Sequence, residues 1–394
     1  MRIAEITAYH VRIGLRKTVR HASHTRDEND TLVARCRMDD GTEGWGEGLP
    51  RPYVTGETIE SALEQLRQAR WQEVAERFED LRGGVAVAER VHRALPASAA
   101  TGRDCFGNSV RCAVELSILD AAARACGEPL SAVTALVEET AAIRQARARV
   151  RYSAAITASG SARQTARALM FRLFGFRQAK AKVGVEGVDD AMALRRIRRA
   201  LGSGFDLRID ANEAWSCATL EQRLEPLLPC RISALEQPVP HAEVEGLAAV
   251  RKRIAVPIML DESLCSFSDA ERALERGTCD LFNIRLSKCG GFLPSLRLAA
   301  LAHQAGLGYQ LGCQVGETGV LSAAGRHFAT SVGGIRYLEG SFDRLLVKER
   351  LTVEDLTFGY GGWAPALSGP GLGVRIDTAA VARVTVREEH WKIA

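Results

Sequence analysis

Residues 206–212 read DLRIDAN, a short apolar run that ends in a carboxylate and an amide. The pattern returns at residues 232–238, ISALEQP, and at residues 257–263, PIMLDES. Similar runs recur about every 25 residues, and the segments between them have the apolar spacing of helices. The full set is RVRYSAAI (149–156), AKAKVG (179–184), DLRIDAN (206–212), ISALEQP (232–238), PIMLDES (257–263), DLFNIRL (280–286), GYQLGC (308–313) and GIRYLEG (334–340). Eight strand–helix units of this length predict an α/β fold with a (β/α)8 barrel; the alternative is a doubly wound parallel sheet.

The chain on either side of this repeat has other patterns. Residues 1–60 alternate like antiparallel strands, whereas residues 57–145 have the three-to-four spacing of helices. Residues 365–394 alternate again, so we expect them to return to the N-terminal region. The expected organisation is an N-terminal α+β domain at 1–145, a barrel at 146–360 and a C-terminal segment at 361–394.

Three consecutive barrel strands are predicted to end in a carboxylate. These are Asp210, Glu236 and Asp261. The carboxyl ends of barrel strands form one rim, where barrel enzymes place their active sites. Three carboxylates on that rim would repel one another, and an octahedral Mg²⁺ site resolves the repulsion. The alternative is that each acid caps the next helix or pairs with a nearby arginine.

Lysines are expected to flank this site. Lys180 and Lys182 alternate with Ala181, so both point to one face of the strand beside Asp210. Two ammonium groups near a metal ion should lower the pKa of one lysine, which makes it a usable base near neutral pH. Lys288 follows the sixth strand, across the barrel, and could reach the other face of a bound carboxylate's α-carbon. A lysine at a helix start or on the surface is the alternative for Lys288.

The chain resembles the enolase superfamily, specifically its mandelate racemase/muconate-lactonizing-enzyme-like subgroup. The resemblance rests on Lys180-Ala181-Lys182, RIDANEAW at Asp210, ALEQP at Glu236, LDES at Asp261, NIRLSKCGG at Lys288, the helix AVELSILDAAARACGEPL and the hairpin TLVARCRMDDGTEGWGEG. It implies a modified (β/α)7β barrel of the TIM type, with an α+β capping domain formed by the N-terminal region and the C-terminal tail. It also implies one Mg²⁺ per active site and a small carboxylate substrate. In this reading Lys182 is the base on one face, Lys288 is the acid or base on the other, and Lys180 binds the substrate carboxylate.

Some positions depart from the pattern of the family. Arg285 stands where the family often has lysine, and Val315-Gly316-Glu317 has valine in place of a methionine. Dipeptide epimerases of the subgroup have an Asp-x-Asp pair after the eighth strand, where this chain has Tyr337 and Glu339. Dipeptide specificity is therefore in doubt. The expected substrate-binding or supporting residues on the barrel are Asn212, Glu262, Arg285, Cys313, Gln314, Glu317 and Glu339.

Two polar loops of the N-terminal domain are candidates for substrate specificity. RHASHTR contains His21, His24 and Arg26, which could contact a distal and anionic end of the substrate. PRPYVTGET resembles a second specificity loop, with Tyr53 as the contact. The alternative is that both are solvated loops. Loops on rigid scaffolds often carry specificity.

Composition restricts the partners and the compartment. The 52 basic and 48 acidic residues give a formal net charge of +4, so no general attraction to nucleic acid or membrane is expected. The first residues do not read as a signal peptide, and no apolar run has the length of a membrane span. Ten cysteines show no zinc-ligand spacing, which favours a reducing cytoplasm. The resemblance implies a homo-oligomer.

The sequence leaves three functions open. The first is an isomerase that removes the α-proton of a metal-bound carboxylate through a stabilised enediolate, as a racemase or epimerase of an amino-acid derivative or small dipeptide. The second is a dehydratase or cycloisomerase that uses the same half-reaction. The third is a barrel that binds a carboxylate without catalysis.

Overall fold

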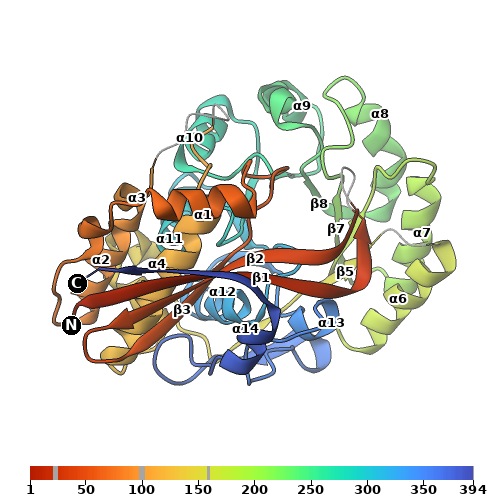
Figure 1. The fold of residues 1–394 in the computed structure, drawn as a ribbon. Helices are drawn as coiled ribbons and strands as arrows, with labels where there is room; N and C mark the ends of the chain where they lie inside the picture. The colour runs from red at the N-terminus through yellow and green to blue at the C-terminus, as the bar shows by residue number, and fades with distance from the viewer. Residues whose placement is uncertain (21–24, 97–102, 158–159, 394) are drawn as a thin grey trace.

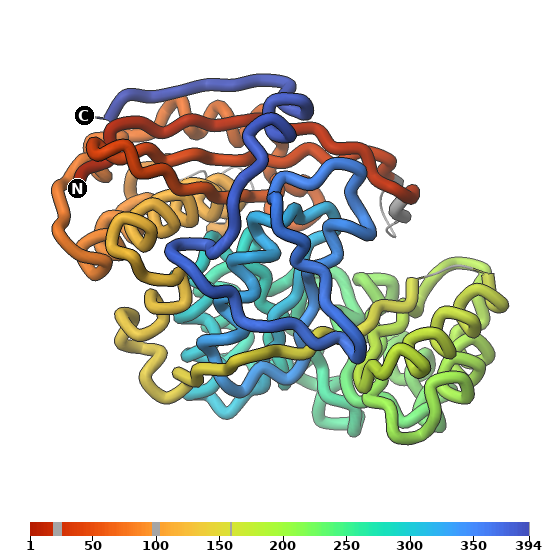
Figure 2. The backbone as a smooth tube through the Cα atoms, turned by 90° about the horizontal axis from the view of Figure 1, so that it is seen from below, coloured from red at the N-terminus to blue at the C-terminus, as the bar shows by residue number. Residues whose placement is uncertain are grey.

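A computed structural model describes residues 1–394 except 21–24, 97–102, 158–159 and 394, and the side chains of 19, 20 and 25 are also left out. It has a capping domain beside a barrel (Figure 1). An antiparallel sheet of order β14-β1-β2-β3 forms the cap. Its strands are β1 (Ile3–Arg20), β2 (Thr25–Met38), β3 (Glu43–Gly48) and β14 (Thr385–Lys392). The C-terminal segment thus pairs with the N-terminal strand β1, and Figure 2 shows both termini on the cap.

Helices cover one face of this sheet. They are α1 (Ile59–Arg67), α2 (Leu81–Glu89), α3 (Val91–Ala94), α4 (Asn108–Ala125) and α5 (Val133–Leu136). Gly44, Gly46 and Gly48 alternate along β3, so they share the face that packs on α4. A Cβ on any of the three would overlap the α4 backbone. The glycines of EGWGEG therefore allow the helix to lie directly on the strand.

The barrel sheet contains eight strands among the described residues, in the order β12-β11-β10-β9-β8-β7-β6-β5, and neighbouring strands are parallel. The strands are β5 (Ala154–Ile156), β6 (Gln178–Lys182), β7 (Asp206–Asp210), β8 (Ile232–Glu236), β9 (Ile258–Leu260), β10 (Leu281–Ile284), β11 (Gly308–Leu311) and β12 (Ile335–Leu338). The Ser153 backbone N–H donates to Leu338 O at 2.8 Å, which connects the last strand to the first. Each of the eight predicted runs overlaps one of these strands.

Helices connect the barrel strands on the outside. They are α6 (Ser161–Leu173), α7 (Asp190–Leu201), α8 (Leu220–Leu224), α9 (Leu247–Arg251), α10 (Phe267–Arg276), α11 (Phe292–Gln304) and α12 (Gly319–Ser331). After β12 the chain makes the four-residue helix α13 (Asp343–Leu346) in place of a full barrel helix. The predicted (β/α)7β architecture with an α+β cap is confirmed, and the doubly wound sheet is excluded.

The first predicted run divides into two strands. β4 (Arg149–Arg151) pairs with β13 (Trp363–Pro365) in a separate two-stranded sheet, and the barrel strand β5 follows it. From β13 the chain continues through α14 (Thr378–Val384) to β14 in the cap. No helix among the described residues is long and apolar enough to cross a membrane.

Buried carboxylates join the cap to the barrel helices. Glu47 on β3 accepts hydrogen bonds from the backbone N–H groups of Thr318 and Leu321 at the start of α12. Glu115 on α4 accepts from Phe292 and Leu293 at the start of α11, at 2.6 and 3.0 Å. Carboxylates are favourable at helix N-termini because they bind unpaired N–H groups and oppose the helix dipole. These contacts hold the cap over the strands β10 and β11.

Candidate active site

The three predicted acids gather at the carboxyl ends of adjacent strands. Asp210 and Glu236 are the last residues of β7 and β8 and pair across the sheet, and Asp261 follows β9. Their exposed fractions are 2%, 0% and 0%. Buried carboxylates of this kind need a cation or hydrogen bonds to offset their lost hydration.

Lys180 lies in the centre of this group. Its Nζ is 3.2 Å from Asp210 Oδ2, 3.0 Å from Glu236 Oε1 and 3.0 Å from Glu339 Oε1. Desolvation lowers the pKa of Lys180, but the nearby carboxylates outweigh it and the pKa lies well above its ordinary value. The sequence predicted a lowered pKa for one of the two lysines, and Lys180 is not that lysine, because three carboxylates face its ammonium group.

Arg285 provides a second cation at the same place. It follows β10, and its Nη2 contacts Asp261 Oδ2 and lies 3.7 Å from Glu236 Oε1. Desolvation lowers the pKa of Arg285, yet Asp261, Glu262 and Glu236 raise it well above its usual value. Arg285 therefore keeps its proton. The sequence predicted Arg285 as a substrate-binding or supporting residue, and the structure places it among the acids.

The three acids offer the carboxylate oxygens that Mg²⁺ prefers as ligands, and two cationic side chains lie between them. Within the described ranges, no group of three or more His, Cys, Asp or Glu side chains is placed to hold a metal ion. Lys180 contacts Asp210 and Glu236, and Arg285 contacts Asp261 and Glu236, so these cations lie between the acids. Glu236 Oε2 is buried and has no hydrogen-bond partner among the described residues. An orphaned carboxylate oxygen beside two further carboxylates fits a hard divalent cation.

Lys182 has a different environment from Lys180. Its backbone pairs with Asp210 across β6 and β7, and its Nζ donates to the side-chain oxygen of Asn212. The Asn212 Nδ2 donates in turn to Glu262 Oε1 at 3.3 Å. Burial raises the pKa of Glu262, and the charge of Asp261 raises it further. The structure thus brings Lys182, Asn212 and Glu262 together beside the acids.

Lys288 is placed differently from the prediction. Its side chain is fully buried, and its Nζ donates to Asp261 O, Asp261 Oδ1 and Asn283 O at 2.6, 2.9 and 2.8 Å. Those three acceptors use the three hydrogens of an ammonium group. Lys288 therefore holds Asp261 through its backbone carbonyl and Oδ1, whereas Arg285 contacts Oδ2 of the same carboxylate. The reason is local: β10 ends at Ile284, and the following turn directs residue 288 back toward Asp261.

Glu339, after β12, is already paired. Lys180 and Arg208 both contact its carboxylate, and desolvation, which raises its pKa, is outweighed by these two cations, so the pKa is lowered. The Tyr337 hydroxyl lies 3.0 Å from Ser233 Oγ. Ser233 is near the start of β8, so this contact is at the end of the barrel opposite the acids. The two positions therefore do not form a carboxylate clamp for an ammonium group.

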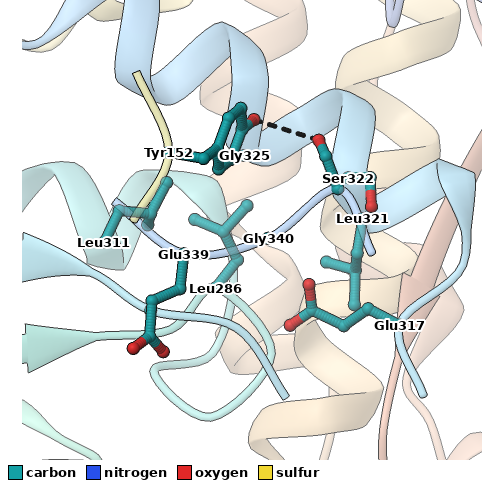
Figure 3. Close-up of a pocket in the computed structure, with 11 residues that line it drawn as sticks. Tyr152, Leu286, Leu311, Glu317, Leu321, Ser322, Gly325, Glu339 and Gly340 are labelled. Atoms are coloured by element: carbon teal, nitrogen blue, oxygen red, sulfur yellow. Dashed lines mark hydrogen bonds between the residues drawn. The ribbon is translucent and has the colours of Figure 1, made fainter. Parts of the chain in front are cut away.

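A small cavity adjoins Glu339, and its lining comes from the ends of β11 and β12 and from α12. Figure 3 shows Glu317 and Glu339 on two of its walls, with Leu286, Leu311 and Tyr152 among the other lining residues. Burial raises the pKa of Glu317 to about 8. Cys313 and Gln314, which were also predicted near the site, do not line this cavity. The Gln314 N–H donates to Glu317 Oε1 at 2.6 Å, so Gln314 supports Glu317 through its backbone.

Two of the predicted contact residues of the cap, Arg26 and Tyr53, lie in the described part of the chain. Arg26 Nη2 donates to the Tyr53 hydroxyl at 3.1 Å, and its guanidinium lies 5.7 Å from the centre of the Tyr53 ring. The structure thus brings these two predicted residues together. His21 and His24 lie outside the described residues.

Sequence reasoning missed two buried side chains that hold the acids. Arg208 is fully buried on β7 and contacts Glu339, with its guanidinium 4.5 Å from the Tyr337 ring centre. Asn283 on β10 donates to Glu236 Oε1 at 2.9 Å. Strand alternation could have indicated Arg208, because it shares a face with Asp210 two residues on.

Comparisons with known proteins agree with this architecture. Residues 161–380 match the family described as enolase C-terminal domain-like. The chain is 30% identical over 380 residues to an L-Lys-D/L-Arg epimerase of Methylococcus capsulatus, covering 95% of this chain and 99% of that one. It is 30% identical to an N-succinylamino acid racemase of Thermus thermophilus, covering 91% of each. The crystal structure of an N-succinyl Arg/Lys racemase from Bacillus cereus superposes with a TM-score of 0.87 at 22% identity over all of both chains, which bears on the fold alone.

The chain therefore belongs to the enolase superfamily, in its mandelate racemase/muconate-lactonizing-enzyme-like subgroup. Its named relatives are isomerases, and the protein is an enzyme of that class. The third function left open by the sequence, a barrel that binds without catalysis, is set aside by this membership.

Proposed function

We propose that the protein is a Mg²⁺-dependent racemase or epimerase that removes the α-proton of an amino-acid derivative, with Lys182 as the base. The carrying observation is that Asp210, Glu236 and Asp261 end adjacent strands and that Lys182 lies beside them, bound to a neutral amide rather than a carboxylate. Relatives named as a hydrophobic dipeptide epimerase and an N-succinylamino acid racemase support this class.

Asp210, Glu236 and Asp261 would hold the metal ion through oxygen atoms. Mg²⁺ at such a site supplies positive charge that stabilises the second negative charge developing on a carboxylate substrate. Lys180 and Arg285 would then serve as cations for the substrate carboxylate, and Lys182 would accept the proton from the α-carbon.

The preferred substrate is an amino acid whose nitrogen carries no charge. A free α-ammonium group needs an unpaired carboxylate, and Glu339 already contacts two cations, Lys180 and Arg208. Adding a third cation to that carboxylate would displace one of them at a cost in free energy. N-acylated amino acids avoid that cost, and Arg26 beside Tyr53 could bind an anionic end of the acyl group.

Exchange of the α-hydrogen tests the proposal. Matched pairs of N-acyl and free amino acids are incubated with the protein and Mg²⁺ in D₂O, and deuterium incorporation is followed by NMR. We expect exchange to be faster for the N-acyl member of each pair. Absence of exchange with every carboxylate tested, in protein shown by calorimetry to bind Mg²⁺, would contradict the proposed function.

A second candidate is β-elimination or cycloisomerisation with a base on one face only. Arg285 favours it, because arginine stands where the family often has lysine and it keeps its proton at all working pH values. Racemisation needs a proton donor on the second face, and Lys288 would have to leave Asp261 and Asn283 to provide it. Inversion of configuration supports the racemase, whereas loss of water or ring opening without inversion supports the second candidate.

A further inference from the structure

Two lysines two residues apart on β6 have opposite surroundings. Lys180 Nζ lies 3.0–3.2 Å from three carboxylates. In the described part of the chain Lys182 makes no ion pair, and the hydrogen bond of its Nζ goes to the amide oxygen of Asn212. A carboxylate partner favours the ammonium form of lysine, whereas a neutral acceptor does so much less.

Asn212 is held in one orientation from two sides. Its backbone has φ of 44°, in the left-handed region that asparagine tolerates better than most residues, and its N–H donates to Asp210 Oδ1 at 3.0 Å. Its side-chain Nδ2 donates to Glu262 Oε1. Because Glu262 accepts from the nitrogen end of the amide, the oxygen end faces Lys182. Asn212 is only 9% exposed, so water competes little for these contacts.

We propose that Asn212 is a positioning residue for Lys182 and that Glu262 fixes the orientation of its amide. The inference rests on the proposed function of Lys182 as the base. Asn212 occupies one hydrogen of the lysine amine, which sets the direction of the nitrogen lone pair, and it does so without adding a charge. Misplacing a base by about 1 Å can cost on the order of 10²-fold in rate.

The first variant removes the side chain and keeps the backbone. Asn212→Gly retains the left-handed conformation, and we expect kcat for α-hydrogen exchange to fall by about 10–100-fold. KM and the dissociation constant for Mg²⁺, measured by calorimetry, should change by less than about threefold, because Asn212 does not contact the substrate in this account. Arg231→Gly is the matched control, since Arg231 has φ of 54° before β8 at the opposite end of the barrel and its side chain is exposed. An equal fall in both variants, or a fall in KM alone, would overturn the proposal.

Glu262 is tested by a pair of variants. Glu262→Gln keeps an oxygen that can accept from Asn212, whereas Glu262→Met has similar length and no such acceptor. We expect Glu262→Met to lower kcat at least about fivefold more than Glu262→Gln. Equal kcat values in the two would contradict the role of Glu262.

A labelling measurement decides the inference even if no substrate is found. Lys182 is acetylated by a limiting pulse of acetic anhydride at a series of pH values, and its modification is measured by peptide mass spectrometry. Asn212→Asp puts a carboxylate on Lys182, so the labelling midpoint should move to higher pH by about 1 unit relative to wild type. An unchanged midpoint would show that residue 212 does not contact Lys182 in solution, whereas missing exchange in wild type would count against the proposed function alone.

Discussion

Arg285 is the residue whose role separates the candidate reactions. Its guanidinium contacts Asp261 Oδ2 and lies near Glu236, whereas Lys288 contacts Asp261 Oδ1. Arginine offers fixed positive charge for a developing anion but does not transfer a proton near neutral pH. We therefore propose Lys182 as the base, because its Nζ makes no ion pair among the described residues, whereas Lys180 and Lys288 both contact carboxylates.

Arg285→Lys should reduce the preference of the exchange reaction for one enantiomer. Lysine at this position can titrate, so it provides a proton donor and acceptor on the second face. We expect the wild type to exchange one enantiomer of an N-acyl amino acid faster than the other, and the variant to narrow that ratio by about tenfold or more. The two rates are measured by NMR in D₂O on each pure enantiomer. An unchanged ratio in a variant that still binds Mg²⁺ would show that residue 285 does not face the α-carbon.

Some residues of this site were predictable from the sequence and others were not. The difference lies in whether a strand, a turn or a distant partner fixes the position of the side chain. Asp210 and Glu236 were predictable because a strand end fixes where a side chain points. Lys288 was predicted to reach the second face of a bound carboxylate, but its contacts with Asp261 were not predictable, because they depend on the turn after β10 and no local pattern describes that turn. Arg208 was missed since its partner Glu339 lies far along the chain, just after β12.

Strand β3 shows most clearly how the spacing of residues determines packing. Its alternating glycines bring the strand backbone against α4, and tryptophan and glutamate occupy the other face. The eight barrel strands were likewise predictable from repeated short runs. The division of the first run into β4 and β5 was not, because β4 pairs with β13, more than 200 residues later.

Gly46→Ala should destabilise the cap. A Cβ at this position would overlap the carbonyl oxygen of Ala113 on α4, so strand and helix must separate. We expect a loss of about 2 kcal/mol or more, in the range of overpacked cores, seen as a lower Tm in calorimetry. Gly204→Ala is the control: a Cβ there has no heavy atom within 4 Å, so its Tm should be unchanged or slightly higher. Equal Tm values for the two variants would contradict this packing.

At the scale of the whole molecule, buried acids couple the cap to the barrel. Burial raises the pKa of Glu47 to about 7 and that of Glu115 to about 8, despite the N–H groups that each accepts from. Both residues join the cap to barrel helices, so their protonation affects how the two parts are held together. The homo-oligomer implied by the family resemblance stays a prediction.

Stability should fall as pH rises from about 5 to 8.5. A carboxyl group whose pKa is raised on folding binds its proton more tightly in the folded state, so its contribution is present below pH 4.5 and is lost as pH rises through the folded value. We expect the Tm of metal-free protein to drop by roughly 5 °C across this window. Glu47→Gln should flatten the slope, and the exposed Glu245→Gln should not. A Tm that rises over the window, or an equal slope in Glu47→Gln, would contradict this assignment.

The most direct test of the whole account is α-hydrogen exchange by Lys182→Met, compared with wild type on the same N-acyl amino acid in D₂O with saturating Mg²⁺. Methionine keeps most of the length of the side chain and removes the amine. We predict that exchange falls by about 10²–10⁴-fold while Mg²⁺ binding and Tm stay close to wild type. Exchange at the wild-type rate in this variant would contradict the claim that Lys182 removes the proton.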